Sequence, residues 1–150
     1  MTHQIDSALV WFRRDLRCDD HAALYYALKE AKRVWCVFVL DTDILAPLPR
    51  QDRRVTFILR SLDQLHDGLS QLAESAGQTG AGLMVRHGHP VDEIPRLAAQ
   101  LGVQGIFANH DDEPAALERD AAIRGRLSNQ GVALYTCKDH VIFERNEILT

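Results

Sequence analysis

Residues 10–24, VWFRRDLRCDDHAAL, begin as an apolar run and end as the alanine-rich start of a helix. Three arginines (Arg13, Arg14 and Arg17) and three aspartates lie between these two segments. A buried strand that passes through a short polar turn into a helix is the first half of a βαβ unit. The stretch therefore predicts an α/β fold, provided that the same alternation continues along the chain.

The alternation does continue, because five apolar runs alternate with four helical patterns. The runs, rich in Val, Leu, Ile and Phe, cover residues 7–12, 33–40, 82–87, 104–109 and 132–137. Nearly continuous apolar runs are typical of strands that are covered on both faces. Since no hairpin signal separates them, we predict a doubly wound, Rossmann-like, five-stranded parallel sheet flanked by helices.

The helices are predicted from apolar residues at three- and four-residue spacing. The clearest pattern has these inner positions: Val55, Ile58, Leu59, Leu62, Leu65, Leu69, Leu72, Ala73 and Ala76. We expect Asp20 to be the N-cap of the first helix. We expect Gly77, Gly102 and Gly131, each just past a helical pattern, to adopt left-handed C-cap conformations.

Composition limits the classes of function. The chain has 150 residues, a formal charge of −4 and a pI of about 5.9, so it is no general electrostatic match for nucleic acid. Its three cysteines are far apart and show no disulfide framework, which favours a reducing compartment. No secretory leader and no run of 18 apolar residues is present, so we predict a cytoplasmic protein without a membrane partner.

In such sheets, ligands bind beyond the carboxyl ends of the strands. His87 and His89 follow the third strand, but two histidines are weak support for a metal site, and we predict none. Three carboxylates, Asp111, Asp112 and Glu113, follow the fourth strand. These acids either offset the dipole of the next helix or accept hydrogen bonds from a polar ring, and the residues alone leave both readings open.

Arg13, Arg14 and Arg17 also allow two interpretations. They either pair with nearby carboxylates to hold the first turn together, or form a cradle for an anionic ligand or another domain. We take the architectural role as the working prediction. No nucleophile, metal or acid–base constellation stands out, so no catalytic residue is predicted.

The opening stretch resembles the N-terminal signature of the DNA photolyase/cryptochrome family, W-[FH]-R-x-D-L-R-x-x-D-N-x-A-L. The matching residues are Trp11, Phe12, Arg13, Asp15, Leu16, Arg17, Asp20, Ala23 and Leu24. Cys18 and His21 stand where the family usually has leucine and asparagine. The similarity continues through residues 37–45, 53–65, 109–120 and 141–150, so it covers nearly the whole chain.

The resemblance implies that residues 1–150 form the α/β antenna domain of a deoxyribodipyrimidine photolyase, a lyase that splits cyclobutane pyrimidine dimers. Its expected partners are a C-terminal helical domain, which binds FAD and is absent from these 150 residues, and UV-damaged DNA, bound through the full-length protein. The antenna passes excitation energy to the reduced FAD. We therefore expect the 150 residues to be inactive by themselves.

The resemblance also implies a site for the antenna chromophore. The positions that correspond to deazaflavin contacts are Val39, Arg54, Val55, Thr56, Asp111 and Arg119, and Glu113 fits as well. Folate-binding members carry an Asn-Glu pair where this chain has Ala115 and Ala116. We therefore rank 8-hydroxy-deazaflavin first, FMN second and methenyltetrahydrofolate third.

Two other functions compete with this interpretation. A cryptochrome, which signals without repair, is not distinguished from a photolyase by this domain. An unrelated nucleotide-binding module of the universal-stress or electron-transfer-flavoprotein type would need a glycine-rich phosphate loop after the fourth strand. The sequence there, NHDDEP, is acidic and would repel phosphate.

Overall fold

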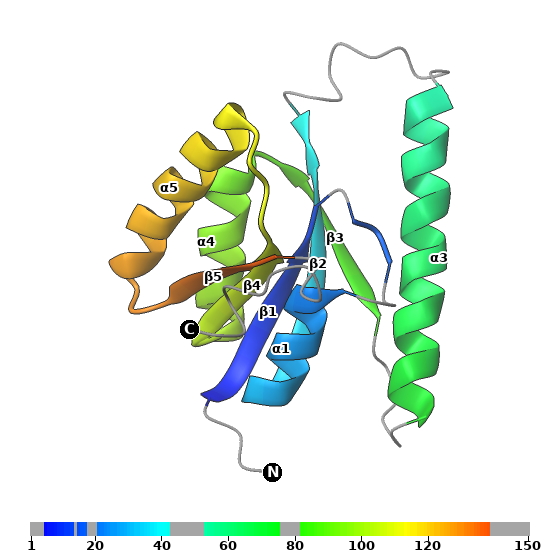
Figure 1. Ribbon diagram of the computed structural model, residues 1–150, viewed down its shortest axis with the longest axis horizontal. Coiled ribbons are helices and arrows are strands. Elements are labelled where there is room, and N and C mark those ends of the chain that lie inside the picture. The colour runs from blue at the N-terminus through cyan, green and yellow to red at the C-terminus, as the bar shows by residue number, and fades with distance from the viewer. Residues whose placement is uncertain (1–4, 14, 18–20, 43–52, 76–81, 139–150) are drawn as a thin grey trace.

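The computed structural model describes residues 5–13, 15–17, 21–42, 53–75 and 82–138 (Figure 1). Along the chain its elements are β1 (Ile5–Phe12), α1 (Ala22–Glu30), β2 (Ala31–Asp41), α3 (Arg53–Ser75), β3 (Leu83–Gly88), α4 (Pro90–Leu101), β4 (Gly105–Asn109), α5 (Pro114–Ser128) and β5 (Ala133–Cys137). Each predicted apolar run is a strand, and the first two strands begin two residues earlier than predicted.

The strands form one parallel sheet in the order β3-β2-β1-β4-β5. This confirms the predicted doubly wound α/β fold. The chain moves outward from β1 to β3, then returns to β4 on the other side of β1. The strand order therefore reverses between β1 and β4, and the turns that follow these two strands lie at the reversal point.

Alternate residues of β1 pack into two hydrophobic cores, one on each face of the sheet. Ala8, Val10 and Phe12 pack with α1 and with Leu65 and Leu69 of α3. The remaining strand residues Leu9 and Trp11 pack on the other face, in a cluster with Ile94 and Leu97 of α4 and Ile123 and Leu127 of α5. Helices α1 and α3 thus cover one face and α4 and α5 the other (Figure 1). Two-sided burial explains why the strands are apolar throughout.

Helix α3 is longer than the edge strand β3 beside it. Its 23 residues span about 35 Å, whereas the six residues of β3 span about 20 Å. Only Leu62, Leu65 and Leu69 of the predicted inner stripe are therefore buried. The prediction was wrong at Leu59 and Leu72, which are exposed because they lie beyond the core.

The helix ends confirm one of the capping predictions and contradict another. The N-cap of α1 is His21, so the prediction of Asp20 was wrong, and Asp20 itself lies outside the described residues. Gly102 ends α4 in the left-handed conformation, as predicted. Gly131 is also left-handed, but the C-cap of α5 is Asn129, two residues earlier. Gly77 lies outside the described residues.

Two further features bear on the setting of the protein. No helix in the described part of the chain is long and apolar enough to cross a membrane. Cys36 is buried, Cys137 is partly buried, and neither forms a disulfide with another described residue. Cys18 lies outside the described residues.

Candidate functional site

Arg13 links the elements that meet at the point where the strand order reverses. Its Nη1 donates to both carboxylate oxygens of Asp120 in α5, at 2.7 and 2.8 Å, and its Nη2 donates to the carbonyl of Asn109 at the end of β4. The side chains of Arg13 and Asp120 are only 7% and 4% exposed. A buried ion pair therefore ties the first turn to β4 and α5, which confirms the architectural interpretation for this arginine.

The turn after β1 is also tied to the start of α1 through Asp15. The side-chain amide of Asn109 donates to Asp15 Oδ2 and accepts a bond of 2.9 Å from the backbone N–H of Ala23. The backbone N–H of Arg13 donates to Asp15 Oδ1 at 3.3 Å. Burial by itself raises the pKa of Asp15, but His21, Asn109 and the Arg13 backbone outweigh it, so the pKa lies below its usual value.

His21 caps α1 in a way that sequence reasoning did not anticipate. Its Nδ1 accepts a hydrogen bond of 3.1 Å from the backbone N–H of Leu24, which requires this nitrogen to carry no proton. Its Nε2 lies 3.0 Å from Asp15 Oδ2, close but poorly aligned for a linear hydrogen bond. The ring also packs against Phe12, with centroids 4.6 Å apart. The imidazole thus takes the place of the asparagine that is usual in the family signature.

Trp11, at the end of β1, lies between two guanidinium groups. The central carbons of Arg13 and Arg119 are 4.9 and 5.0 Å from the centroid of its ring, within cation–π range. Arg119 Nε lies 3.6 Å from Asp120 Oδ1, beyond ordinary hydrogen-bond distance. Arg119 Nε and Nη2 are buried and have no hydrogen-bond partner in the described part of the chain.

The positive charge of Arg119 is therefore only partly compensated by neighbouring carboxylates. Burial, followed by the positive charge of Arg13, lowers the pKa of Arg119 below its usual value. The carboxylates of Asp120 and Asp111 oppose this shift without cancelling it. Asp111 is thus close enough to interact electrostatically with Arg119, and these two predicted site residues lie together at the carboxyl edge of the sheet.

The acids after β4 are arranged around a turn. Asp111 Oδ1 accepts a bond of 3.0 Å from the backbone N–H of Glu113, and Asp112 Oδ1 lies 2.8 Å from His110 Nε2. Glu113 occupies the N-cap position of α5 without a side-chain capping bond, and Pro114 follows it. The helix contains no acid in its first turn, so all three carboxylates lie before the helix.

The other predicted site residues approach this edge from two directions. Val39 lies in β2, where its side chain is buried, so only its backbone can contact a ligand. Arg54, Val55 and Thr56 form the first turn of α3, at the same end of the molecule as the tip of β2 and the start of α5 (Figure 1). Arg54 and Thr56 are exposed there and Val55 is half-buried.

The sequence did not predict that Asp120 and Asn109 bind Arg13 at the reversal point. Asp120 and Asn109 stand in the quoted motif of residues 109–120, but nothing local to them predicts a bond to Arg13, which is 107 and 96 residues away. The available signal was the placement of polar residues at the ends of two strands that flank the reversal point. Arg14 and Asp19 lie outside the described residues.

The predicted absence of a metal site concerns His87 and His89. His89 Nδ1 and Nε2 each lie 3.4 Å from the hydroxyl of Thr42, and His89 is the N-cap residue of α4 without a side-chain capping bond. Among the described residues no group of three or more His, Cys, Asp or Glu side chains is placed to hold a metal ion.

The chain thus forms a doubly wound α/β domain with a network of polar side chains at the point where the strand order reverses. The family model for DNA photolyase matches residues 8–150. The chain therefore belongs to the DNA photolyase family, which excludes the alternative of an unrelated nucleotide-binding module.

Relatives of two kinds are similar to the chain. Cryptochrome-2 of Gallus gallus is 34% identical over 139 residues, which are 93% of this chain and 23% of that protein. Cryptochrome-1 of Erithacus rubecula is 31% identical over 143 residues, 95% of this chain and 22% of that protein. The chain thus spans less than a quarter of the length of these relatives.

Solved structures show the same fold. The photolyase of Sulfolobus tokodaii superposes with a TM-score of 0.75 and 31% identity, over 88% of this chain and 29% of that one. A Synechocystis cryptochrome has a TM-score of 0.69 and 26% identity, over 91% of this chain and 28% of that one. Photolyases and cryptochromes thus both resemble this domain.

Proposed function

We propose that this chain is the antenna-chromophore-binding domain of a light-dependent flavoprotein, and that the whole protein is a photolyase acting on cyclobutane pyrimidine dimers. The antenna would absorb light and transfer excitation energy to an FAD bound outside residues 1–150. The task of this domain would be to hold the chromophore at a fixed distance and orientation. UV-damaged DNA would be bound through the rest of the protein.

The observation that carries the proposal is the state of Arg119. Its buried Nε and Nη2 atoms lack partners in the described part of the chain. An unpaired buried donor costs about 1–3 kcal/mol, and more for a charged group. A carbonyl or ionised hydroxyl on a bound ring would supply the acceptor, and Asp111 beside it would accept a ring N–H or O–H. Together the two side chains suit a chromophore that carries donors and acceptors on one edge.

The start of α3 supports an aromatic ligand. Val55 and Ile58 continue the inner stripe of Leu62, Leu65 and Leu69 but are only half-buried. A flat ring system lying against these two side chains would complete their burial, and each buried square ångström of apolar surface is worth about 25 cal/mol. Arg54 and Thr56, on the same turn, would contact polar groups at its rim.

Two observations support the type of chromophore that we propose. The Sulfolobus tokodaii photolyase was solved with two FAD molecules, which imply a novel light-harvesting cofactor in that protein. This supports a flavin-like antenna here, and the residues that correspond to deazaflavin contacts are the reason to rank 8-hydroxy-deazaflavin ahead of FMN. Ala115 and Ala116 offer only methyl groups, and Ala116 is buried, so the side-chain contacts expected for methenyltetrahydrofolate are missing.

A cryptochrome-type light receptor is the second candidate, favoured by the 34% identity with Gallus gallus cryptochrome-2. The two are separated by illuminating the full-length protein with an oligonucleotide that contains a cyclobutane dimer. A photolyase restores the dimer to two pyrimidines. Full FAD content and antenna transfer without any repair would identify the receptor instead.

The antenna site is tested by chromophore loading of the full-length protein. Arg119→Gln should lose most of the antenna absorbance, while FAD content stays unchanged. The matched control is Arg124→Gln, on the same helix, whose guanidinium donates to the carbonyl of Leu134 and to no other described residue. A wild-type protein that takes up neither deazaflavin nor FMN nor a second FAD would contradict the proposal, and so would equal loading of the two variants.

A further inference from the structure

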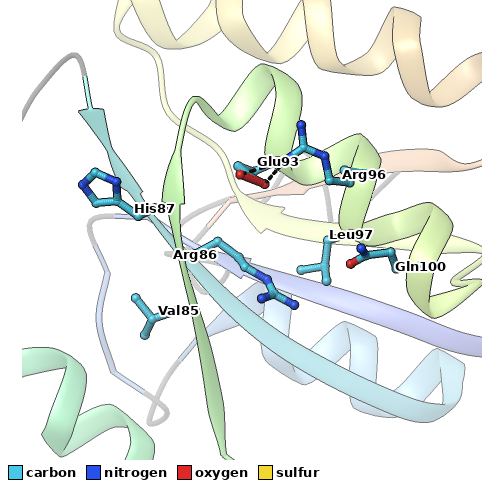
Figure 2. Close-up of a pocket in the computed structure, with 7 residues that line it drawn as sticks. All are labelled: Val85, Arg86, His87, Glu93, Arg96, Leu97 and Gln100. Atoms are coloured by element: carbon cyan, nitrogen blue, oxygen red, sulfur yellow. Dashed lines mark hydrogen bonds and ion pairs between the residues drawn. The ribbon is translucent and has the colours of Figure 1, made fainter.

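A depression of about 420 Å³ lies between the edge strand β3 and helix α4 (Figure 2). Its lining includes Arg86, His87, Glu93, Arg96, Leu97 and Gln100. No residue of the predicted antenna site lines it. Its volume falls within the range of about 300–1,000 Å³ that is typical of small-molecule sites.

The strand register explains why Arg86 points into this depression. Arg86 pairs with Val39 of β2, and registered residues of parallel strands point to the same face. Since Val39 belongs to the cluster with α4 and α5, Arg86 also faces α4, toward Leu97 and Gln100 (Figure 2). Leu97 is buried in that cluster, so the floor of the depression is the core itself.

A second guanidinium is fixed in place by α4. Arg96 Nη1 donates to both oxygens of Glu93, at 3.0 and 2.9 Å. Glu93 is itself held against Gly88, where a Cβ atom would come within 3.0 Å of its side chain. The Glu93 side chain is 17% exposed and that of Arg96 is 60% exposed. Glu93 thus holds the Arg96 guanidinium in place, while the remaining N–H donors of Arg96 face outward. Because the guanidinium is already ordered, binding a ligand costs less entropy.

The depression carries a positive charge on an acidic chain. Two arginines and one glutamate give it a net charge of +1, compared with −4 for the whole chain. The side chain of Arg86 makes no hydrogen bond or ion pair with any other described residue, so its guanidinium donors are available to a ligand. Guanidinium groups bind phosphate oxygens in a bidentate manner, and a Gln amide suits a hydroxyl group.

We propose that this depression binds a phosphorylated small polar molecule of the size of a pentose phosphate. Arg86 binds the phosphate group, and Arg96 contributes a second charged contact. Gln100, on the same side of β3 as Arg86, binds a hydroxyl group (Figure 2). The proposal is independent of the antenna, because no predicted antenna residue takes part in it.

Protection of the sheet edge is the competing explanation for Arg86, since charged side chains on edge strands prevent pairing with other chains. The two explanations differ in their consequences. Edge protection predicts that Arg86→Gln increases self-association without any effect on phosphate binding. A ligand site predicts a loss of binding while the protein keeps its sedimentation coefficient.

The test is calorimetric titration of the full-length protein with ribose 5-phosphate, inorganic phosphate and ribose. We expect saturable binding of ribose 5-phosphate, weaker binding of inorganic phosphate and none of neutral ribose. Arg86→Gln should weaken the binding of ribose 5-phosphate about tenfold or more, because a charge-assisted contact is lost. Arg96→Gln should weaken it by a smaller factor.

The matched control is Arg33→Gln, which removes the same charge from an exposed position on β2. It should bind ribose 5-phosphate as the wild type does. The proposal is overturned if the wild type shows no saturable binding, if Arg86→Gln binds normally, or if both variants lose affinity equally. Equal loss would mean that only the overall charge matters.

Discussion

The turn after β1 and the depression beside β3 use the same residue type in opposite ways. Arg13 is 7% exposed and its guanidinium donates to a carboxylate and a carbonyl. Arg86 is exposed and makes no hydrogen bond or ion pair with any other described residue. Arg13 thus joins parts of the fold, whereas Arg86 offers its donors to the surroundings.

This difference shows how a cluster of charges should be interpreted. Transferring a guanidinium from water into the protein interior costs several kcal/mol, and in Arg13 the ion pair with Asp120 offsets this cost. An exposed arginine stays hydrated and needs none. Burial together with pairing therefore separates architectural arginines from those available for binding, and the first of the following predictions tests that separation.

The largest effect should come from breaking the buried pair. Asp120→Ala leaves Arg13 buried without its carboxylate and should lower the free energy of unfolding by about 3–5 kcal/mol, measured by denaturant titration. Arg126→Ala breaks a pair with Asp92 of similar length, 2.8 Å, whose side chains are about half exposed. That change should cost less than about 1 kcal/mol. Similar costs for the two variants would remove the distinction between the regions.

The next effect concerns the antenna site rather than stability. Asp111→Asn keeps an acceptor for the backbone of Glu113 but removes the charge, and should weaken chromophore loading about ten- to hundredfold, or 1.5–3 kcal/mol. FAD content and repair under direct flavin excitation should not change. Asp112→Asn, on the same turn, is the control and should load normally. A normal affinity of Asp111→Asn would place the chromophore elsewhere.

Asp15 should make the turn sensitive to acid. Since its folded pKa lies below the usual value of 3.8, its contribution to stability is fully present above 3.8 and is lost as the pH falls through the folded pKa. Asp15→Asn should therefore cost about 1–3 kcal/mol at pH 7. The difference from wild type should shrink only below pH 3.8. Unfolding titrations across this range would show a constant difference if the carboxylate has no such role.

The smallest effect should come from the cap of α1. His21→Ala removes the acceptor for the Leu24 N–H and should cost about 0.5–2 kcal/mol. His21→Asn restores a capping oxygen and should recover most of this loss. Thermal unfolding of the three proteins measures both changes. An asparagine variant as unstable as the alanine variant would show that packing of the ring against Phe12 matters more than the cap.

The sequence was sufficient for the alternation of strands and helices and for the family. Residues in a strand buried on both faces are apolar whatever their partners are, so the five runs could be identified locally. Ala116, Ile123 and Leu127, at helical spacing in α5, are likewise apolar and buried. Asp111 and Arg119 interact electrostatically, but that they contact a chromophore stays a prediction.

Only the tertiary structure decided which charges meet. The pairing of Arg13 with Asp120 depends on a crossover that brings residues 107 positions apart to one edge of the sheet. The exposure of Leu59 and Leu72 depends on the length of α3 relative to its neighbours, and the open position of Arg86 depends on β3 being an edge strand. Local patterns report whether a residue is buried. The spatial order of the strands decides which partner a buried charge has, and whether a charge at the sheet edge has a partner. The reason is that electrostatic pairing depends on distance in space and not on separation in sequence.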